Sequence, residues 1–336
     1  MPPSPETIPR HMPAWICRDY GGPEVLALQD RPVPLPGPGD VLIRVRATSV
    51  SSADMRVRSQ RLPRGFGLMG RLAFGLRRPR QPVLGTDVAG IVVAVGSRAT
   101  PWRPGDEVIG VTGAAMGGHA AYCRVSLKKP LARKPAHLTF EAAASLPFGG
   151  LTALHFLRRA KLLAGEHLLV LGAAGAVGSA FVQLARHQGA HVTAVTSASN
   201  ETLLRSLGAE RVIDRHQTDF TTLPERFDVI ADTVGVSSFA ACVLRLREHG
   251  RYLSVAGSLS DVLVRGSGTR RSMGGPAANR PQDLLELVRL ADAGAYQPVI
   301  DGIYPFNQLP AAHARVETGR KRGSVIVSTC TPAAGR

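Results

Sequence analysis

The chain has 336 residues, of which 44% are hydrophobic and 20% charged, so we expect a globular protein long enough for two domains. Its formal net charge is +16, a balance that can indicate a nucleic-acid partner. No nucleic-acid-binding motif accompanies the charge, so we expect basic residues scattered over the surface and no nucleic-acid partner.

The first residues give no sign of a targeting or membrane segment. "MPPSPETIPRHM" lacks the apolar core of a signal peptide, and nowhere does the chain hold about 18 apolar residues in a row. We expect a disordered extension over residues 1–13, with Met12 as an alternative start, a cytoplasmic location and no membrane partner. The cysteines lie far apart, which predicts neither a disulfide framework nor a cysteine-rich zinc site; they are Cys17, Cys123, Cys242 and Cys330.

Residues 14–136 are rich in short β-type runs separated by glycine and proline, such as residues 40–50 and 89–96. This pattern predicts a mostly antiparallel β domain. One stretch within it, residues 61–82 ("RLPRGFGLMGRLAFGLRRPRQP"), is dense in arginine. We expect it to form a basic loop that could attract an anionic ligand.

From about residue 137 helical stretches alternate with continuous apolar strands. Such strands are buried on both faces, which predicts a parallel, doubly wound sheet over residues 137–271. After a Gly- and Ser-rich loop come a helix and a final strand, "GSVIVS", which we expect to return to the first domain. The predicted fold class is α/β, with a β domain made of residues 14–136 and 272–336.

The stretch "HLLVLGAAGAVGSAFVQLARHQGAHVTAVTS", residues 167–197, predicts a strand, a tight turn, a helix and a second strand. Its glycines are spaced Gly172-x-x-Gly175-x-x-Gly178. Gly175 would let a pyrophosphate approach the helix N-terminus, and Gly178 would let the helix pack on the sheet. An ordinary glycine-rich turn is the alternative, but the order of elements favours dinucleotide binding. The expected contacts are Gly172, Ala174, Gly175, Ala176, Val177 and Gly178.

The end of the second strand indicates which dinucleotide is bound. Residues 192–200 hold no Asp or Glu that could accept from a ribose 2′-OH. Ser197 and Asn200, with Arg215 further on, suit a 2′-phosphate, so we expect NADP(H). Ser197 and Asn200 could also cap the next helix, and both interpretations can hold at once.

These segments together resemble the zinc-independent quinone oxidoreductase branch of the medium-chain dehydrogenase/reductase superfamily. The resemblance runs from about residue 14 to 328 and implies a GroES-like β domain interrupted by a Rossmann domain. It also implies NADPH-dependent reduction of quinones or of carbon–carbon double bonds conjugated to a carbonyl. The matching segments include "YGGPEVLAL", "PGPGDVLIRVRATSVSSAD", "LGTDVAGIVVAVG", "RPGDEVIG", "GGHAAYCRV", "GAAGAVGSAFVQLA", "SLGAERVID", "DTVG" and "GRKRGSVIVS".

The resemblance places further residues at the cofactor. It implies that Thr152 lies near the nicotinamide phosphate or carboxamide, and that a turn holding Thr233, Val234 and Gly235 closes the site. Val255 and Gly257 would run beside the nicotinamide. Arg215 stands where relatives have an uncharged tyrosine, which adds a cation near the adenosine end. We also expect a homodimer.

The resemblance also implies that no metal is bound. Zinc-dependent relatives carry cysteine where this chain has Ser51, and His and Glu where it has Thr86 and Asp87. Ser51 and Thr86 are poor zinc ligands. Ser51 and Ser52 further replace the Asn-Pro pair that is usual in the quinone reductase branch.

Without a metal, hydride can add to the far end of a conjugated substrate, and hydrogen-bond donors can stabilise the oxyanion. The catalytic candidates are Ser51, Asp54 and Tyr122. Asp54 could instead fix the local backbone, and Tyr122 could be a core aromatic. Two alternatives stay open: an alcohol or ketone dehydrogenase, and a non-catalytic NADPH-binding protein.

Overall fold

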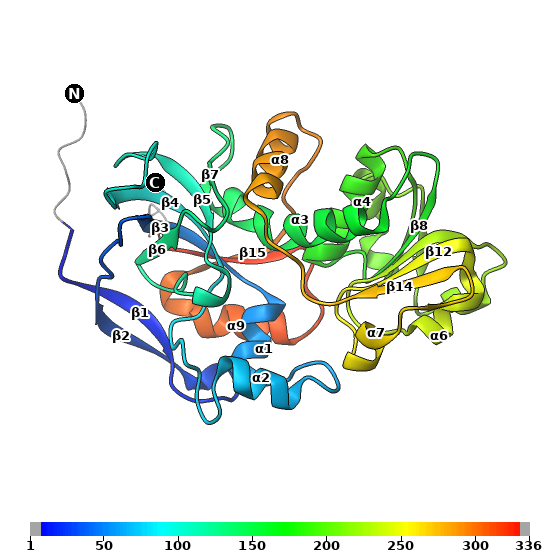
Figure 1. The fold of residues 1–336 in the computed structure, drawn as a ribbon, viewed down its shortest axis with the longest axis horizontal. Helices are drawn as coiled ribbons and strands as arrows, with labels where there is room; N and C mark the ends of the chain where they lie inside the picture. Colours follow the sequence, from blue (N-terminus) through cyan, green and yellow to red (C-terminus); the bar gives the residue numbers. More distant parts are fainter. Residues whose placement is uncertain (1–7, 330–336) are drawn as a thin grey trace.

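The computed structural model describes residues 8–329, which form two α/β lobes joined side by side (Figure 1). One lobe is built on a seven-stranded sheet with strand order β10-β9-β8-β11-β12-β14-β13, parallel except for the short β13. The middle strands β8 and β11 are buried over most of their length, which explains their largely apolar sequence. The strands are β8 (His167–Leu171), β9 (His191–Thr196), β10 (Arg211–Asp214), β11 (Phe227–Asp232), β12 (Leu246–Ser254), β13 (Gly266–Ser267) and β14 (Arg270–Gly274).

The other lobe is built on a mostly antiparallel sheet with strand order β15-β16-β3-β4-β5-β7, and β6 pairs with β3. The last strand, β16, lies between β15 and β3, so the lobe draws on both ends of the chain. The predicted α/β fold class, a mostly antiparallel β domain beside a parallel sheet, is confirmed. The strands are β3 (Asp40–Val50), β4 (Asp87–Val95), β5 (Glu107–Val111), β6 (Tyr122–Ser126), β7 (Leu131–Arg133), β15 (Ile300–Pro305) and β16 (Ser324–Ser328).

Helix α3 (Phe140–Ala160) joins the two lobes, because it packs on β3, β4 and β16 and also on α4 (Ala176–His187). One hydrophobic cluster consequently runs through both lobes, from Ala47 and Ile326 to Phe181. Among residues 8–329, no helix has the length and apolar character needed to cross a membrane. The other helices are α1 (Ser52–Ser59), α2 (Gly67–Phe74), α5 (Glu201–Ser206), α6 (Phe239–Cys242), α7 (Leu259–Leu263), α8 (Pro281–Asp292) and α9 (Leu309–Glu317).

Three local expectations need correction. The extension expected over residues 1–13 ends earlier, because β1 (His11–Cys17) pairs with β2 (Leu26–Pro32) and buries Met12; residues 1–7 lie outside the described part. The basic segment 61–82 is not only a loop, since it contains α2. Strand β14 also continues the parallel sheet three residues beyond the expected boundary at residue 271.

Candidate active site

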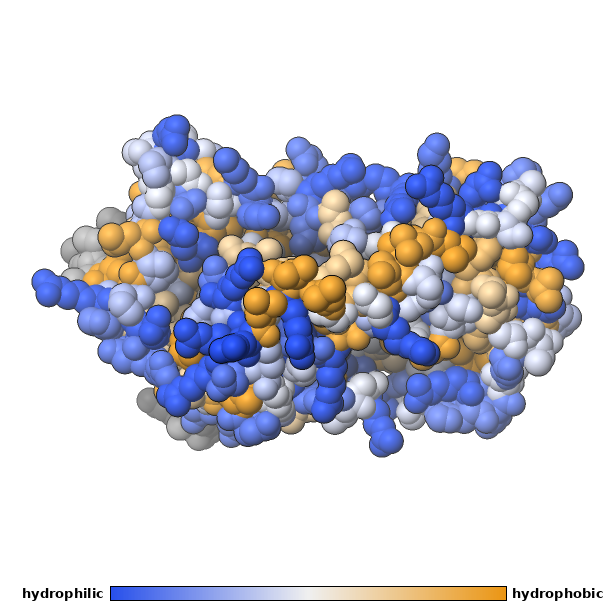
Figure 2. All heavy atoms as spheres, turned by 60° about the horizontal axis from the view of Figure 1, so that its bottom comes forward, coloured by the Kyte–Doolittle hydropathy of each residue, from blue (hydrophilic) through white to orange (hydrophobic). Residues whose placement is uncertain are grey.

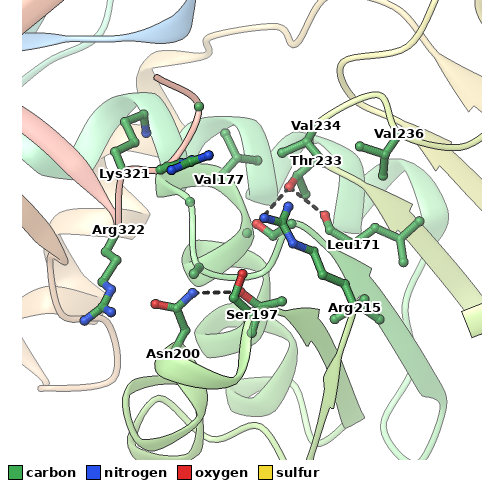
Figure 3. A pocket seen from close by; sticks show the side chains of 18 of the residues that line it. Leu171, Val177, Ser197, Asn200, Arg215, Thr233, Val234, Val236, Lys321 and Arg322 are labelled. Carbon is green, nitrogen blue, oxygen red and sulfur yellow. Dashed lines mark hydrogen bonds between the residues drawn. The ribbon is translucent and has the colours of Figure 1, made fainter. Parts of the chain in front are cut away.

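A cleft of about 1300 Å³ lies between the lobes, at the carboxyl ends of β8, β9 and β11. Its walls come from the glycine-rich turn after β8, from the loops after β9, β10 and β11, from α1 and from residues 316–322. Open parallel sheets bind ligands at this edge. Figure 3 shows the part of the cleft around the turn.

Each glycine of the turn has a different structural role. Gly172 has a left-handed φ of +74°, which favours glycine. A Cβ at Gly178 would lie 2.3 Å from the Gly172 carbonyl oxygen, so only glycine lets α4 approach the strand this closely. A Cβ at Gly175 would meet only that oxygen, at 3.6 Å, and would project into open space. Gly175 therefore leaves room for an anion at the N-terminus of α4.

All six residues expected to contact the cofactor at this turn do line the cleft. They are Gly172, Ala174, Gly175, Ala176, Val177 and Gly178.

The residues expected at the adenosine end also line the cleft: Ser197 and Asn200 after β9, and Arg215 after β10. Neither Ser197 nor Asn200 makes a helix-capping hydrogen bond through its side chain. The buried Asn200 donates from Nδ2 to Thr196 Oγ1 at 3.0 Å, while its Oδ1 has no partner among the described residues. Arg205, another arginine between β9 and β10, is engaged elsewhere, because it pairs with Glu201 at 2.8 Å.

A third wall of the cleft carries cations that the motifs did not identify. Residues 319–323 lead into β16 and lie against the glycine-rich turn, where the Gly323 N–H donates to the Ala174 carbonyl at 2.8 Å. Lys321 Nζ donates to the Gly323 carbonyl at 2.7 Å, and burial lowers the pKa of this amine to about 8. Figure 3 shows Lys321 and Arg322 on one side of the turn and Arg215 on the other.

The loop after β11 reaches the cleft through Thr233 and Val234. The Thr233 hydroxyl donates to the Leu171 carbonyl at 2.8 Å and so ties the ends of β8 and β11 together. The buried Asp232 carboxylate accepts from the backbone N–H groups of Val234 and Gly235, at 3.1 and 2.8 Å. Asp232, which sequence reasoning passed over, therefore shapes this turn.

Four expected cofactor contacts are not brought to the wall of the cleft: Thr152, Gly235, Val255 and Gly257. The Thr152 hydroxyl donates to the Phe148 carbonyl of its own helix, at 2.7 Å. A Cβ at Gly257 would lie 2.0 Å from Ser254 Oγ, so this glycine packs against its own strand. The Val255 N–H is held by the Asp232 carbonyl at 3.1 Å.

Two of the catalytic candidates satisfy each other instead of facing the cleft. Ser51 caps α1, accepting from the Asp54 N–H at 3.2 Å, and its hydroxyl donates to the Asp54 carboxylate at 2.6 Å. The second carboxylate oxygen accepts from the Gly85 N–H at 3.1 Å. Both side chains are buried and neither lines the cleft. The structure therefore supports the alternative role for Asp54, which is to fix the local backbone.

Tyr122 also lies away from the cleft. It is half-buried on β6 and packs on a cluster formed by Met12, Ala14 and Ile16 of β1. Its neighbour Cys123 faces the core of the antiparallel sheet, and side chains of a strand alternate between faces. Tyr122 therefore packs between β6 and β1, on the face opposite that core, which agrees better with the alternative packing role than with a catalytic one.

The α1 wall of the cleft is formed by residues that were not selected from the sequence, Ser52, Met55 and Arg56, and Phe148 of α3 also lines the cleft. Arg56 makes no hydrogen bond or ion pair with any of the described residues, and burial lowers its pKa. By contrast, the cleft residue Glu317 is neutralised by Arg58 and Arg61, at 2.8 and 2.7 Å. This wall therefore presents one cation without a protein partner beside apolar side chains.

The positions of the zinc ligands in other dehydrogenases hold a different arrangement. The buried Asp87 carboxylate accepts from Ser49 Oγ at 3.0 Å, and its pKa is raised to about 7 by burial and by the nearby Asp54. Within residues 8–329, no group of three or more His, Cys, Asp or Glu side chains could hold a metal ion.

Comparisons with known proteins agree with this architecture. Residues 37–156 match the alcohol dehydrogenase GroES-like domain family, and residues 207–327 match the zinc-binding dehydrogenase family. The chain is 34% identical to the 2-methylene-furan-3-one reductase of Solanum lycopersicum, covering 96% of this chain and 80% of the relative. It is 33% identical to the chloroplastic NADPH-dependent alkenal/one oxidoreductase of Arabidopsis thaliana, with the same coverage.

A solved structure with a similar fold is the quinone oxidoreductase from Coxiella burnetii, with a TM-score of 0.86 and 30% sequence identity. The match covers 95% of this chain and all of that one (100%). This chain therefore belongs to the medium-chain dehydrogenase/reductase superfamily, in its quinone oxidoreductase-like branch, and is an oxidoreductase.

Proposed function

We propose that this protein uses NADPH to reduce quinones or α,β-unsaturated carbonyl compounds without a metal. The observation that carries the proposal is one cleft, lined at one end by a dinucleotide-type turn and at the other by α1, where Arg56 has no partner among the described residues. Residues 8–329 also hold no cluster of side chains that could bind a metal ion. The substrates named for the tomato, Arabidopsis and Coxiella relatives support the same class.

The residues present fit a phosphorylated dinucleotide. The open space beside Gly175 accommodates a pyrophosphate at the α4 N-terminus, with Lys321 close to the same turn. Asn200 lines the cleft and holds a buried Oδ1 without a partner among the described residues. Ser197, Asn200 and Arg215 would lie around a ribose 2′-phosphate. Bound NADPH supplies a hydride from its nicotinamide.

At the other end of the cleft the chain's own residues position the substrate. Met55 and Phe148 supply apolar surface for a planar conjugated molecule. Hydride addition would leave negative charge on the carbonyl oxygen, and a proton from solvent water would complete the reduction. The Arg56 guanidinium is a donor for that oxygen that no protein group among the described residues occupies. We assign Arg56 to this oxyanion. Ser51 and Asp54 act indirectly, by fixing the start of the helix that carries it.

The test is a panel of quinones, enones and simple ketones, each assayed with NADPH and with NADH. Turnover of quinones or enones with NADPH, but not of ketones, is expected. Preferential turnover of ketones would indicate an alcohol or ketone dehydrogenase instead. Tight NADPH binding with no turnover of any compound would indicate a binding protein.

Location and assembly are further proposals. We propose a homodimer in the cytoplasm, although relatives named above include a chloroplastic enzyme. Sedimentation analysis of the purified protein would test the dimer, and imaging of the tagged protein in cells would test the location.

A further inference from the structure

The basic segment 61–82 has no role in the proposed chemistry, yet it has an unusual surface. Four large apolar side chains are exposed within nine positions: Leu68 at 72%, Met69 at 55%, Leu72 at 56% and Leu76 at 63%. Spacings of three and four residues place Leu68, Met69 and Leu72 on one side of α2, and Leu76 follows just after the helix ends. Figure 2 faces this side of the molecule and shows apolar atoms across its middle, bordered by hydrophilic ones.

The opposite side of α2 is anchored, so the exposed apolar side chains are not left over from a loosely attached helix. Gly70 is buried against Leu62, and Phe74 packs on the hydrophobic cluster that contains Trp15 and Leu84. The Tyr20 hydroxyl donates to the Gly75 carbonyl at 2.7 Å, at the end of the helix. The fold therefore holds the apolar side of α2 outward.

Charge indicates what covers this surface. No Asp or Glu occurs between Asp54 and Asp87. Five arginines of the segment make no side-chain hydrogen bond or ion pair with any residue in the described range; they are Arg64, Arg71, Arg77, Arg78 and Arg80. Their cationic groups border an apolar strip, which is the pattern of a helix lying in a membrane interface with anionic lipid.

Two other occupants fit less well. In a twofold dimer the patch would meet itself, and its arginines would face like charges. A nucleic acid would be bound by the arginines but would leave Leu68, Met69 and Leu72 in water, since they carry no group that hydrogen-bonds a base. An anionic bilayer uses both parts of the surface.

We propose that the face formed by residues 64–80 docks the protein on an anionic lipid bilayer. This differs from our sequence-based expectation of no membrane partner, which rested on the lack of a spanning segment. Helix α1 connects the docking face to the cleft, because Ser52, Met55 and Arg56 line the cleft and the chain enters the segment two residues after Ser59. The cleft would thereby lie close to a source of lipophilic quinones or enones.

The experiment is flotation with vesicles of phosphatidylcholine alone or mixed with phosphatidylglycerol, at low and at high salt. The wild type should bind the mixed vesicles, less so at high salt. Leu68→Ser with Leu72→Ser, and separately Arg77→Gln with Arg78→Gln, should each weaken binding by about tenfold or more. The matched controls are Leu163→Ser with Leu285→Ser and Arg98→Gln with Arg226→Gln, all exposed elsewhere, and they should bind like the wild type.

Unchanged melting temperatures and unchanged NADPH binding in vesicle-free buffer would show that the variants fold. Failure of the wild type to bind mixed vesicles would overturn the proposal, as would full binding by the leucine variant. A dimer that dissociates in the leucine variant would assign the face to a second copy. Duplex DNA bound through the arginines but not the leucines would assign it to nucleic acid. The vesicle readout does not depend on the proposed reductase activity.

Discussion

The two ends of the cleft are built on different principles. At the dinucleotide end the backbone forms the site: the fold itself requires glycine at Gly172 and Gly178, while Gly175 leaves open the space that a pyrophosphate would fill. At the α1 end side chains form the site. There the polar side chains of Ser51 and Asp54 hydrogen-bond each other in the helix cap and are not available to a ligand. A backbone site is therefore visible in a short motif, whereas a side-chain site depends on which groups remain free after folding.

The strongest test of the backbone site compares two glycines. Gly175→Val should weaken NADPH binding by at least about 100-fold with little change in melting temperature, because the new side chain enters open space that the pyrophosphate needs. Gly178→Val should instead reduce stability, since its Cβ would lie 2.3 Å from a backbone oxygen. Fluorescence titration and thermal denaturation measure the two effects. Tight NADPH binding by the Gly175 variant would exclude the turn as the phosphate site.

The side-chain site is tested at Arg56. Arg56→Met keeps much of the apolar contact and removes the charge, so kcat for an enone should fall by about 10- to 100-fold while the NADPH Kd stays within about twofold. The exposed Arg98→Met serves as the control. A weaker NADPH Kd with unchanged kcat would move Arg56 to the cofactor end of the cleft.

Cofactor choice is tested at Arg215. A charge-assisted hydrogen bond contributes about 1.5 to 3 kcal/mol, so Arg215→Ala should weaken NADPH binding by roughly one to two decades and leave NADH nearly unchanged. Arg205→Ala is a close control, because Arg205 is engaged with Glu201. Equal weakening of both cofactors would place Arg215 at the shared adenine, and a wild type that prefers NADH would contradict our interpretation of the segment after β9.

A smaller effect is expected from Lys321, whose pKa is lowered to about 8. A bound phosphate favours the charged amine, so NADPH affinity should be constant from pH 7 to about 8 and fall by about tenfold towards pH 10. The Lys321→Met variant should bind NADPH more weakly at pH 7, and its affinity should not fall between pH 8 and 10.

Lys321 also affects stability in the absence of cofactor. In the unfolded chain the Lys321 amine keeps its proton up to about its ordinary pKa of 10.5, whereas in the folded protein it loses the proton near pH 8. Lys321 therefore makes the free energy of unfolding rise between pH 8 and 10.5. If the variant shows the same pH dependence of NADPH affinity and of unfolding free energy, another group is responsible for it.

The smallest effect concerns the capping pair. Ser51→Ala should lower the free energy of unfolding by about 1 kcal/mol or somewhat more, because it removes a helix cap and leaves the buried Asp54 carboxylate short of a donor. Ser258→Ala removes the equivalent box on α7, where the serine is less buried, and should cost less. Urea denaturation measures both. A loss of kcat without loss of stability would return Ser51 to the list of catalytic candidates.

The sequence allowed the dinucleotide end to be predicted because its elements follow one another within residues 167–215. The role of Ser51 was also accessible: serine followed three residues later by an acidic residue, Asp54, is the pattern of a capping box at the start of a helix. Strand alternation could have placed Tyr122 away from the core face once Cys123 was assigned to it. Lys321 and Arg322 could not be placed, because their position depends on the pairing of Gly323 with the distant Gly175.

The central position of β16 has a consequence for the order in which the protein is made. Val325 pairs with Val50, so the antiparallel sheet cannot be completed until residues 324–328 have left the ribosome. The parallel sheet needs only residues 167–274, which emerge earlier. The lobe that is synthesised first is thus finished last, and until then β3 exposes an unpaired edge that later becomes the middle of a sheet.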